Sequence, residues 1–205
     1  MADLAPRAGV LPLTEEVSLV ILAGGRSERM GRAKADLPVA GTTLLAWLVD
    51  RLSPGFAETL VCGAAAPLGA RAVADRRAGA GPLAGIEAGL HEMRGEVAFV
   101  LACDMPRVTR GLTRLLLDHS LFRDAAAPRV GGRAQPTCAA YRRSALPKIG
   151  HYLDRGERRA IEGLATLDVV YVGEAELAAA AVPLTALADI DTPADYDAFL
   201  ASLRT

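Results

Sequence analysis

The stretch VSLVILAGGRSERMGRAK, residues 17–34, joins an apolar segment to a loop rich in glycine and positive charge. The nearly continuous apolar run predicts a buried strand over Val17–Ala23. Glycines let backbone N–H groups approach a phosphate with no Cβ between them, and cations supply fixed charge, so the loop is predicted to bind a triphosphate. A long surface turn with solvated arginines is the alternative. The glycines of the loop are Gly24, Gly25 and Gly31, and the cations expected to supply this charge are Arg26, Arg29 and Lys34.

Beyond this stretch, strand-like and helix-like segments alternate along the chain. The alternation predicts an α/β fold in which helices cover both faces of a mostly parallel sheet. Ligands of such sheets bind beyond the carboxyl ends of the strands, so functional residues are expected just after strands. Strands are predicted at Thr59–Gly63, Ala72–Asp75, Val97–Cys103, Ala125–Arg129, Thr137–Tyr141 and Asp168–Val172. Helices are predicted at Thr43–Leu52, Leu83–Met93, Thr109–Asp118, Arg143–Leu153 and Pro193–Leu203.

Length, charge and cysteine spacing narrow the class of protein. The 205 residues favour a single domain at residues 17–205 after a flexible leader at residues 1–16. The formal net charge of −1, without a basic block, argues against a nucleic-acid surface and favours a small-molecule substrate. No apolar run near the N-terminus is long enough for a membrane span or a signal segment, so a cytoplasmic location is predicted. The isolated cysteines, predicted to be reduced and buried, are Cys62, Cys103 and Cys138.

Carboxylates occur in two motifs expected at the strand ends. Asp104 follows a predicted strand, where it could hold Mg²⁺ together with triphosphate oxygens or could cap a helix. Asp189 fits either a metal ligand or a helix cap, and Asp191 or Thr192 could cap the helix that follows. The two motifs therefore predict a magnesium site with alternatives in helix capping.

A third glycine cluster, GAGPLAG at residues 79–85, precedes a predicted helix. Its Gly81 would either bring backbone groups against a base or ribose, or allow close packing of helix and sheet. In order and spacing, LAGGRSERMGRAK, the Asp75 before GPLAG, CDMP, QPTCAAY, GERR and DIDTP resemble motifs of the molybdenum cofactor guanylyltransferases, in the wider Rossmann-like nucleotidyltransferase superfamily. The resemblance covers nearly all of the chain after residue 16. It implies a three-layer α/β/α Rossmann-like nucleotidyltransferase fold with a mostly parallel mixed sheet.

The resemblance also implies an activity. Members of this family transfer GMP from GTP to the terminal phosphate of molybdopterin, with Mg²⁺ as cofactor, releasing pyrophosphate and forming the guanine dinucleotide cofactor. The implied partners are GTP and molybdopterin or molybdenum cofactor, with transient contacts to proteins that supply or accept the cofactor. A monomer or weak oligomer is expected. Because the acceptor phosphate is already anionic, no protein nucleophile is expected.

The family pattern assigns roles to individual residues. Arg29, Lys34 and Asp104 would be catalytic, since they would neutralise charge on the phosphates or hold Mg²⁺. Asp189 is a second candidate for the metal. A solvated helix start is the alternative for the two arginines of GERR. The implied nucleotide-binding residues are Leu22, Ala23, Gly24, Gly25, Lys34, Asp75, Gly81 and Asp104. The candidate acceptor-binding residues are Arg158, Arg159, Asp189 and Asp191.

Two departures from the family pattern leave the base open. Cys62 stands where many members have asparagine, and Asp189 and Asp191 stand where they often have paired asparagines. An aspartate at the later position is also common in the cytidylyltransferases that act on the same cofactor, so cytidylyl transfer, or another phosphate acceptor, remains the alternative. LAGG, GPLAG and CDMP favour guanine. A non-catalytic GTP-binding module is the alternative from a different class.

Overall fold

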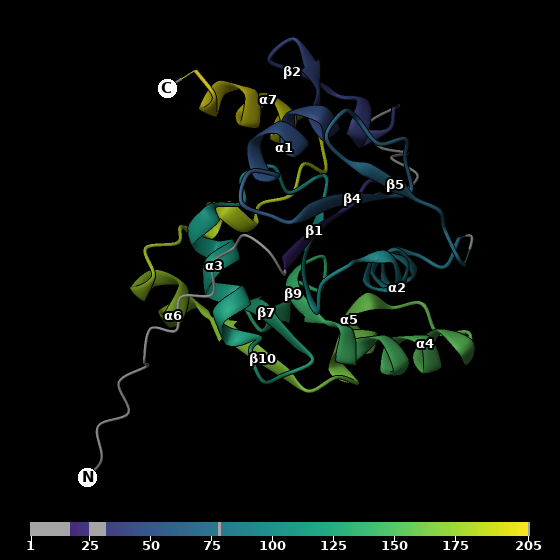
Figure 1. The fold of residues 1–205 in the computed structure, drawn as a ribbon. Helices are drawn as coiled ribbons and strands as arrows, with labels where there is room; N and C mark the ends of the chain where they lie inside the picture. Colours follow the sequence, from purple (N-terminus) through teal and green to yellow (C-terminus); the bar gives the residue numbers. More distant parts are fainter. Residues whose placement is uncertain (1–16, 25–31, 78, 205) are drawn as a thin grey trace.

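The computed structural model describes residues 17–24, 32–77 and 79–204, and helices lie on both faces of a central sheet (Figure 1). The predicted leader at residues 1–16 lies outside this part of the chain. The strand order is β10-β7-β9-β6-β1-β4-β5, with β8 paired to β7. Its strands are β1 (Val17–Leu22), β4 (Glu58–Cys62), β5 (Arg71–Val73), β6 (Val97–Ala102), β7 (Ala125–Val130), β8 (Arg133–Ala134), β9 (Cys138–Arg142) and β10 (Val169–Gly173). A separate hairpin pairs β2 (Pro38–Val39) with β3 (Thr42–Thr43).

The sheet is mixed but mostly parallel, as the sequence predicts. Strand β1 is parallel to both of its neighbours, β4 and β6, whereas β9 is antiparallel to β6 and β7. From β1 the chain continues to β4 on one side, and from β6 it continues to the strands on the other side. The strand order therefore reverses between β1 and β6, and ligands of α/β proteins bind beyond the carboxyl ends of strands at such a point.

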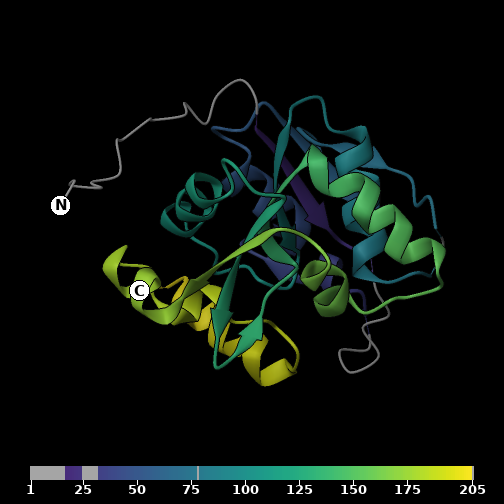
Figure 2. The same cartoon turned by 90° about the horizontal axis from the view of Figure 1, so that it is seen from below.

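Helices cover both faces of the sheet (Figures 1 and 2), and each face has its own hydrophobic core. Along β1, Leu19 and Ile21 belong to one core, and Val20 and Leu22 to the other, as the alternation of side chains in a strand requires. Helices α1 (Leu44–Leu52), α3 (Arg110–His119), α6 (Glu174–Ala179) and α7 (Pro193–Ser202) contribute to the first core. Helices α2 (Pro82–Glu92), α4 (Leu146–Asp154) and α5 (Ala160–Ala165) contribute to the second.

Threonines begin three of these helices. Thr43, Thr109 and Thr192 each precede a helix, and each side chain accepts the backbone N–H of the residue three positions later. Such a cap satisfies an N–H group that has no partner inside the helix and contributes about 1 kcal/mol. For α7 the cap is therefore Thr192, which leaves the Asp191 side chain available for another contact.

The structure confirms the predicted strands and the longer predicted helices, with shifts of a few residues at their ends. The helix predicted from Arg143 was wrong at its start, because Arg143–Ala145 forms a 3₁₀ turn and α4 begins only at Leu146. Pro147 suits the first turn of a helix, since its missing N–H needs no partner there. The hairpin of β2 and β3 lies where the sequence has a hairpin-like stretch, residues 38–41, whereas the short elements α5, α6 and β8 were not predicted. Within the described ranges, no helix has the length and apolar character to cross a membrane.

Candidate active site

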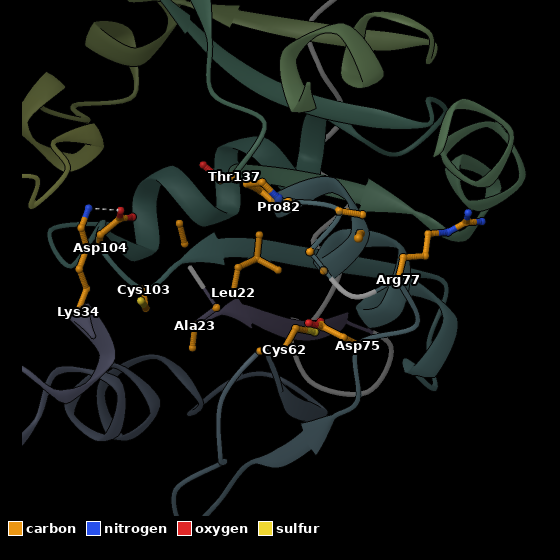
Figure 3. Close-up of a pocket in the computed structure, with 18 of the residues that line it drawn as sticks. Leu22, Ala23, Lys34, Cys62, Asp75, Arg77, Pro82, Cys103, Asp104 and Thr137 are labelled. Carbon is orange, nitrogen blue, oxygen red and sulfur yellow. Dashed lines mark hydrogen bonds and ion pairs between the residues drawn. The ribbon is translucent and has the colours of Figure 1, made fainter. Parts of the chain in front are cut away.

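A cavity of about 890 Å³ opens at the carboxyl ends of β1, β4 and β6 (Figure 3). It lies at the reversal of strand order, where the fold predicts a ligand site. The loop between β5 and α2 and the first turn of α2 form another wall. Its lining includes these predicted site residues: Leu22, Ala23, Gly24, Lys34, Asp75, Gly81, Asp104 and Asp189.

The floor of the cavity depends on a close approach of two loop backbones. Ala23 donates its N–H to the carbonyl of Cys62 at 2.8 Å, which continues the β1–β4 ladder beyond the strands. Gly63 follows with a φ of +86°, and a Cβ at that position would lie 2.6 Å from the Cα of Gly24. Only glycine fits such a contact without displacing the backbone. Gly63 was not among the predicted site residues.

The ammonium group of Lys34 joins two carboxylates at one end of the cavity. Its Nζ lies 2.8 Å from Asp104 Oδ2 and 2.7 Å from Asp191 Oδ1. Burial alone would lower the pKa of Lys34, but the hydrogen bonds to these two carboxylates raise the pKa above its ordinary value. Burial and the charges of Asp104 and Asp191 raise the pKa of Asp189 to about 6. Lys34 is therefore charged, and it partly neutralises a site that is rich in carboxylates.

Backbone contacts fix the loop that carries Asp104. Its carbonyl accepts the N–H of Ile190 at 2.8 Å, which holds the segment with Asp189 and Asp191 against the end of β6. On the other side, the guanidinium of Arg51 in α1 donates to the carbonyls of Pro106 and Val108. Arg51 was not predicted, since its role depends on a helix that is distant in the sequence.

The glycine cluster at residues 79–85 forms the wall opposite Asp104. Gly81 has a φ of +77° and precedes α2, and Pro82 occupies the first position of the helix. A Cβ at Gly81 would lie 3.6 Å from the carbonyl oxygen of Arg158, so the GERR segment packs beside this loop. Asp75, Gly79 and the start of α2 line the cavity together. These residues include Asp75 and Gly81, which the sequence predicts at the nucleotide.

The side chains of Arg158 and Arg159 make local contacts. The Arg158 guanidinium donates to the carbonyl of Glu157 at 3.0 Å, and Arg159 pairs with Glu162 at 2.8 Å. Neither arginine is among the residues that line the cavity. Their predicted contact with the acceptor stays a prediction.

The predictions for Gly25 and Arg29 lie outside the described residues, as do those for Arg26 and Gly31. Cys62 and Cys103 line the cavity, and with Cys138 they are buried free thiols, as the sequence predicts. Burial, with the nearby charge of Asp75, raises the pKa of Cys62 to about 12, so this thiol is not a nucleophile at neutral pH. Thr137 also lines the cavity and was not predicted individually.

The carboxylates at this end of the cavity fit a divalent cation that is shared with a ligand. In the described part of the chain, no group of three or more His, Cys, Asp or Glu side chains is arranged to hold a metal alone. Asp104 and Asp189 line the cavity, and a cationic group, the Lys34 ammonium, already contacts Asp104. Magnesium prefers such oxygen ligands and commonly completes its shell with phosphate oxygens.

Comparison with known proteins gives the family. Residues 19–189 match the family model of the MobA-like NTP transferase domain. The chain belongs to this family. It is 37% identical over 180 residues, 86% of this chain and 88% of the relative, to a probable molybdenum cofactor guanylyltransferase of Pelotomaculum thermopropionicum. A second protein with that name, from Carboxydothermus hydrogenoformans, is 30% identical over 189 residues, 91% of this chain and 96% of the relative.

A solved structure agrees with this membership. The molybdopterin-guanine dinucleotide biosynthesis protein A of Archaeoglobus fulgidus superposes with a TM-score of 0.80 at 25% identity, covering 91% of this chain and 98% of that one. This member of the MobA-like NTP transferase family is therefore a nucleotidyltransferase with the three-layer fold that the sequence motifs imply. The cavity at the strand ends is its candidate active site.

Proposed function

We propose that this MobA-like nucleotidyltransferase transfers GMP from GTP to the terminal phosphate of molybdopterin, metallated or not, and releases pyrophosphate. The observation that carries the proposal is the pairing of Lys34 with Asp104 at one end of a cavity whose other end is lined by Asp75 and the glycine loop. This arrangement offers separate regions for phosphates and base. The relatives reported above carry the guanylyltransferase name, which favours GTP over CTP.

The reaction needs alignment and charge neutralisation more than a protein nucleophile. An oxygen of the acceptor phosphate attacks the α-phosphorus of GTP, and the bond from that phosphorus to the bridging oxygen of pyrophosphate breaks. Lys34 would donate to the phosphates, where negative charge grows on the leaving pyrophosphate. Asp104 and Asp189 would hold Mg²⁺, which when bound supplies electrostatic activation of the α-phosphate.

Lys34 exchanges partners in this proposal. In the structure its ammonium is held by Asp104 and Asp191, and it is mostly buried, with a side chain that is 16% exposed. Arrival of the nucleotide with its metal would supply positive charge to Asp104 and negative charge to Lys34. The lysine would thereby turn from Asp104 to the phosphates with both of these charges still paired, and the Asp191 carboxylate, which is 54% exposed, would be solvated.

A panel of nucleotides tests the function. Purified protein, molybdopterin, Mg²⁺ and one nucleotide are mixed, and pyrophosphate release is followed with GTP, CTP, ATP and UTP in turn. We expect GTP to react at least about tenfold faster than CTP, which corresponds to roughly 1.4 kcal/mol of discrimination. A preference for CTP would make the protein a cytidylyltransferase. GTP binding without turnover of any nucleotide would make it a binding module.

Substitutions at the phosphate end test the assigned roles. Asp104→Asn should keep the fold and lose about 10²–10³ in rate, whereas Asp118→Asn, on the outer surface of α3, should not change the rate. Lys34→Ala should weaken binding of GTP more than binding of GMP, because GMP lacks the β- and γ-phosphates. Equal losses for the two nucleotides, measured by calorimetry, would place Lys34 away from the phosphates.

A further inference from the structure

Arg77 lies in the loop between β5 and α2 and connects two helices of one face. Its Nε and Nη2 donate to the two carboxylate oxygens of Glu87 in α2, at 2.7 and 3.0 Å. The same Nη2 lies 2.8 Å from Oδ1 of Asp154, the last residue of α4. Glu87 is only 6% exposed. A buried carboxylate is costly without a partner, so Arg77 has a fixed place rather than a solvated one.

This fixed guanidinium belongs to the wall of the cavity. Arg77 lines the cavity with Asp75 and the glycines of the same loop. Figure 3 shows it at the end of the cavity opposite Lys34 and Asp104, with its guanidinium directed away from the pocket. Its carbonyl accepts the N–H of Ala80, one residue before Gly81. The side chain therefore holds the loop from the side that faces away from the cavity.

Two features make the anchor stiff. The fork of the guanidinium meets both oxygens of Glu87, a geometry that a lysine cannot reproduce. Glu87 itself is pressed against α4, since a Cβ at Gly150 would lie 3.3 Å from its Oε1. The loop, α2 and α4 are thus tied at one point.

We propose that Arg77 is a positioning residue for the nucleoside end of the substrate: by clamping its own loop, at residues 74–77 and 79–81, to α2 and α4, it holds Asp75 and the loop backbone where they meet the base and ribose. The inference rests on the proposed function and adds a determinant of nucleotide affinity that acts through the loop. The clamp acts on the nucleoside end of the cavity alone, since Lys34 at the phosphate end has no part in it.

The neighbouring residue provides a matched control. Arg76 is exposed, and its side chain makes a long contact, 3.4 Å, with His91 Nδ1. Arg77→Met and Arg76→Met remove the same charge from adjacent positions of one loop. Calorimetry with GTP and with inorganic tripolyphosphate then reports on the whole nucleotide and on its phosphate end separately.

We expect Arg77→Met to weaken GTP binding by about tenfold or more, because small displacements of a positioning group have large effects, while tripolyphosphate binding changes less than about twofold. Arg76→Met should leave both unchanged. Under turnover, the KM for GTP should rise with a smaller change in kcat. The proposal is overturned if Arg77→Met weakens the binding of both ligands equally, or if it leaves GTP binding unchanged.

Milder variants keep the test decisive if Arg77→Met does not fold. Asp154→Asn removes one exposed carboxylate of the clamp, and Arg77→Lys keeps the charge but loses the fork. Both variants should weaken the binding of GTP more than the binding of tripolyphosphate, and wild-type affinity for GTP in both variants overturns the proposal. Failure of the proposed function has a different signature: the wild-type protein would then show no GMP transfer, whatever the variants do.

Discussion

Gly63→Ala offers a direct test of how the floor of the cavity is built. A Cβ on Gly63 would lie 2.6 Å from the Cα and 2.7 Å from the nitrogen of Gly24. Real Cβ contacts are close to 3.4 Å or more, so one backbone must move by several tenths of an ångström at the end of β1 or β4. Because the contact is with backbone, no rotation of a side chain can relieve it.

The expected loss of stability in Gly63→Ala has two parts. Alanine at a φ of +86° costs about 1–2 kcal/mol on conformational grounds. Overpacking against a fixed backbone adds about 1–3 kcal/mol. Gly41→Ala isolates the first part, since Gly41 has a φ of +83° and nothing within 4 Å of its would-be Cβ. The two variants also share the same change in the unfolded chain, so the difference between them reports the contact alone.

Urea unfolding followed by the fluorescence of Trp47, the single tryptophan, gives both free energies of unfolding. We expect Gly63→Ala to be less stable than Gly41→Ala by about 1–3 kcal/mol. We also expect weaker GTP binding only in Gly63→Ala, because Gly24 and Gly63 lie in the wall of the cavity. Equal stabilities for the two variants would refute the close approach of the two strand ends.

Three further predictions concern groups away from the phosphate end. Asp124→Ala removes the carboxylate that accepts from Lys148 at 2.6 Å and should lower the unfolding free energy by about 2–4 kcal/mol near neutral pH. Burial opposes the charge of Asp124, but its hydrogen bonds to Lys148, Asp168 and Ser144 lower its pKa from the ordinary value of 3.8. The difference in unfolding free energy between wild type and Asp124→Ala should therefore shrink as the pH falls below 3.8, and a difference that stays constant would contradict this. Tyr141→Phe, which loses the 2.7 Å bond to the carbonyl of Pro136, should cost about 1 kcal/mol in a urea titration, and an unchanged midpoint would contradict this. Native Cys62, whose pKa burial raises to about 12, should resist alkylation at pH 8, whereas rapid labelling detected by mass spectrometry would show an exposed thiolate.

The order of strands and long helices followed from the sequence because local signals specify each of them. Threonine caps and apolar runs are read within about ten residues, and β1 needs nothing more than its own composition. The helices α5 and α6 have six residues each, too few for a periodic pattern to stand out. The start of α4 also differs from the prediction, since Arg143–Ala145 forms a 3₁₀ turn ahead of Leu146.

The candidate site was predictable where its residues follow strands, and less so where it depends on contacts across the fold. Asp104 and Gly24 come directly after apolar runs, so their placement at the carboxyl edge follows from the topology of parallel sheets. Arg51 holds two carbonyls from helix α1, and Arg77 holds the buried Glu87 from the loop before α2. No local sequence pattern marks an arginine with either role. Their roles emerged only when α1, α2 and α4 were in place.

The contact of Lys34 with Asp191 shows why the last part of the chain belongs to the site. These residues are 157 positions apart, yet their side chains meet at 2.7 Å. Thr192 caps α7 and thereby frees the Asp191 carboxylate, while the bond from Ile190 to Asp104 sets the position of the whole segment. The segment before α7 therefore contributes the charge of Asp191 to the phosphate end. A substitution at Thr192 would act on the site through this geometry, although Thr192 itself is not in the wall of the cavity.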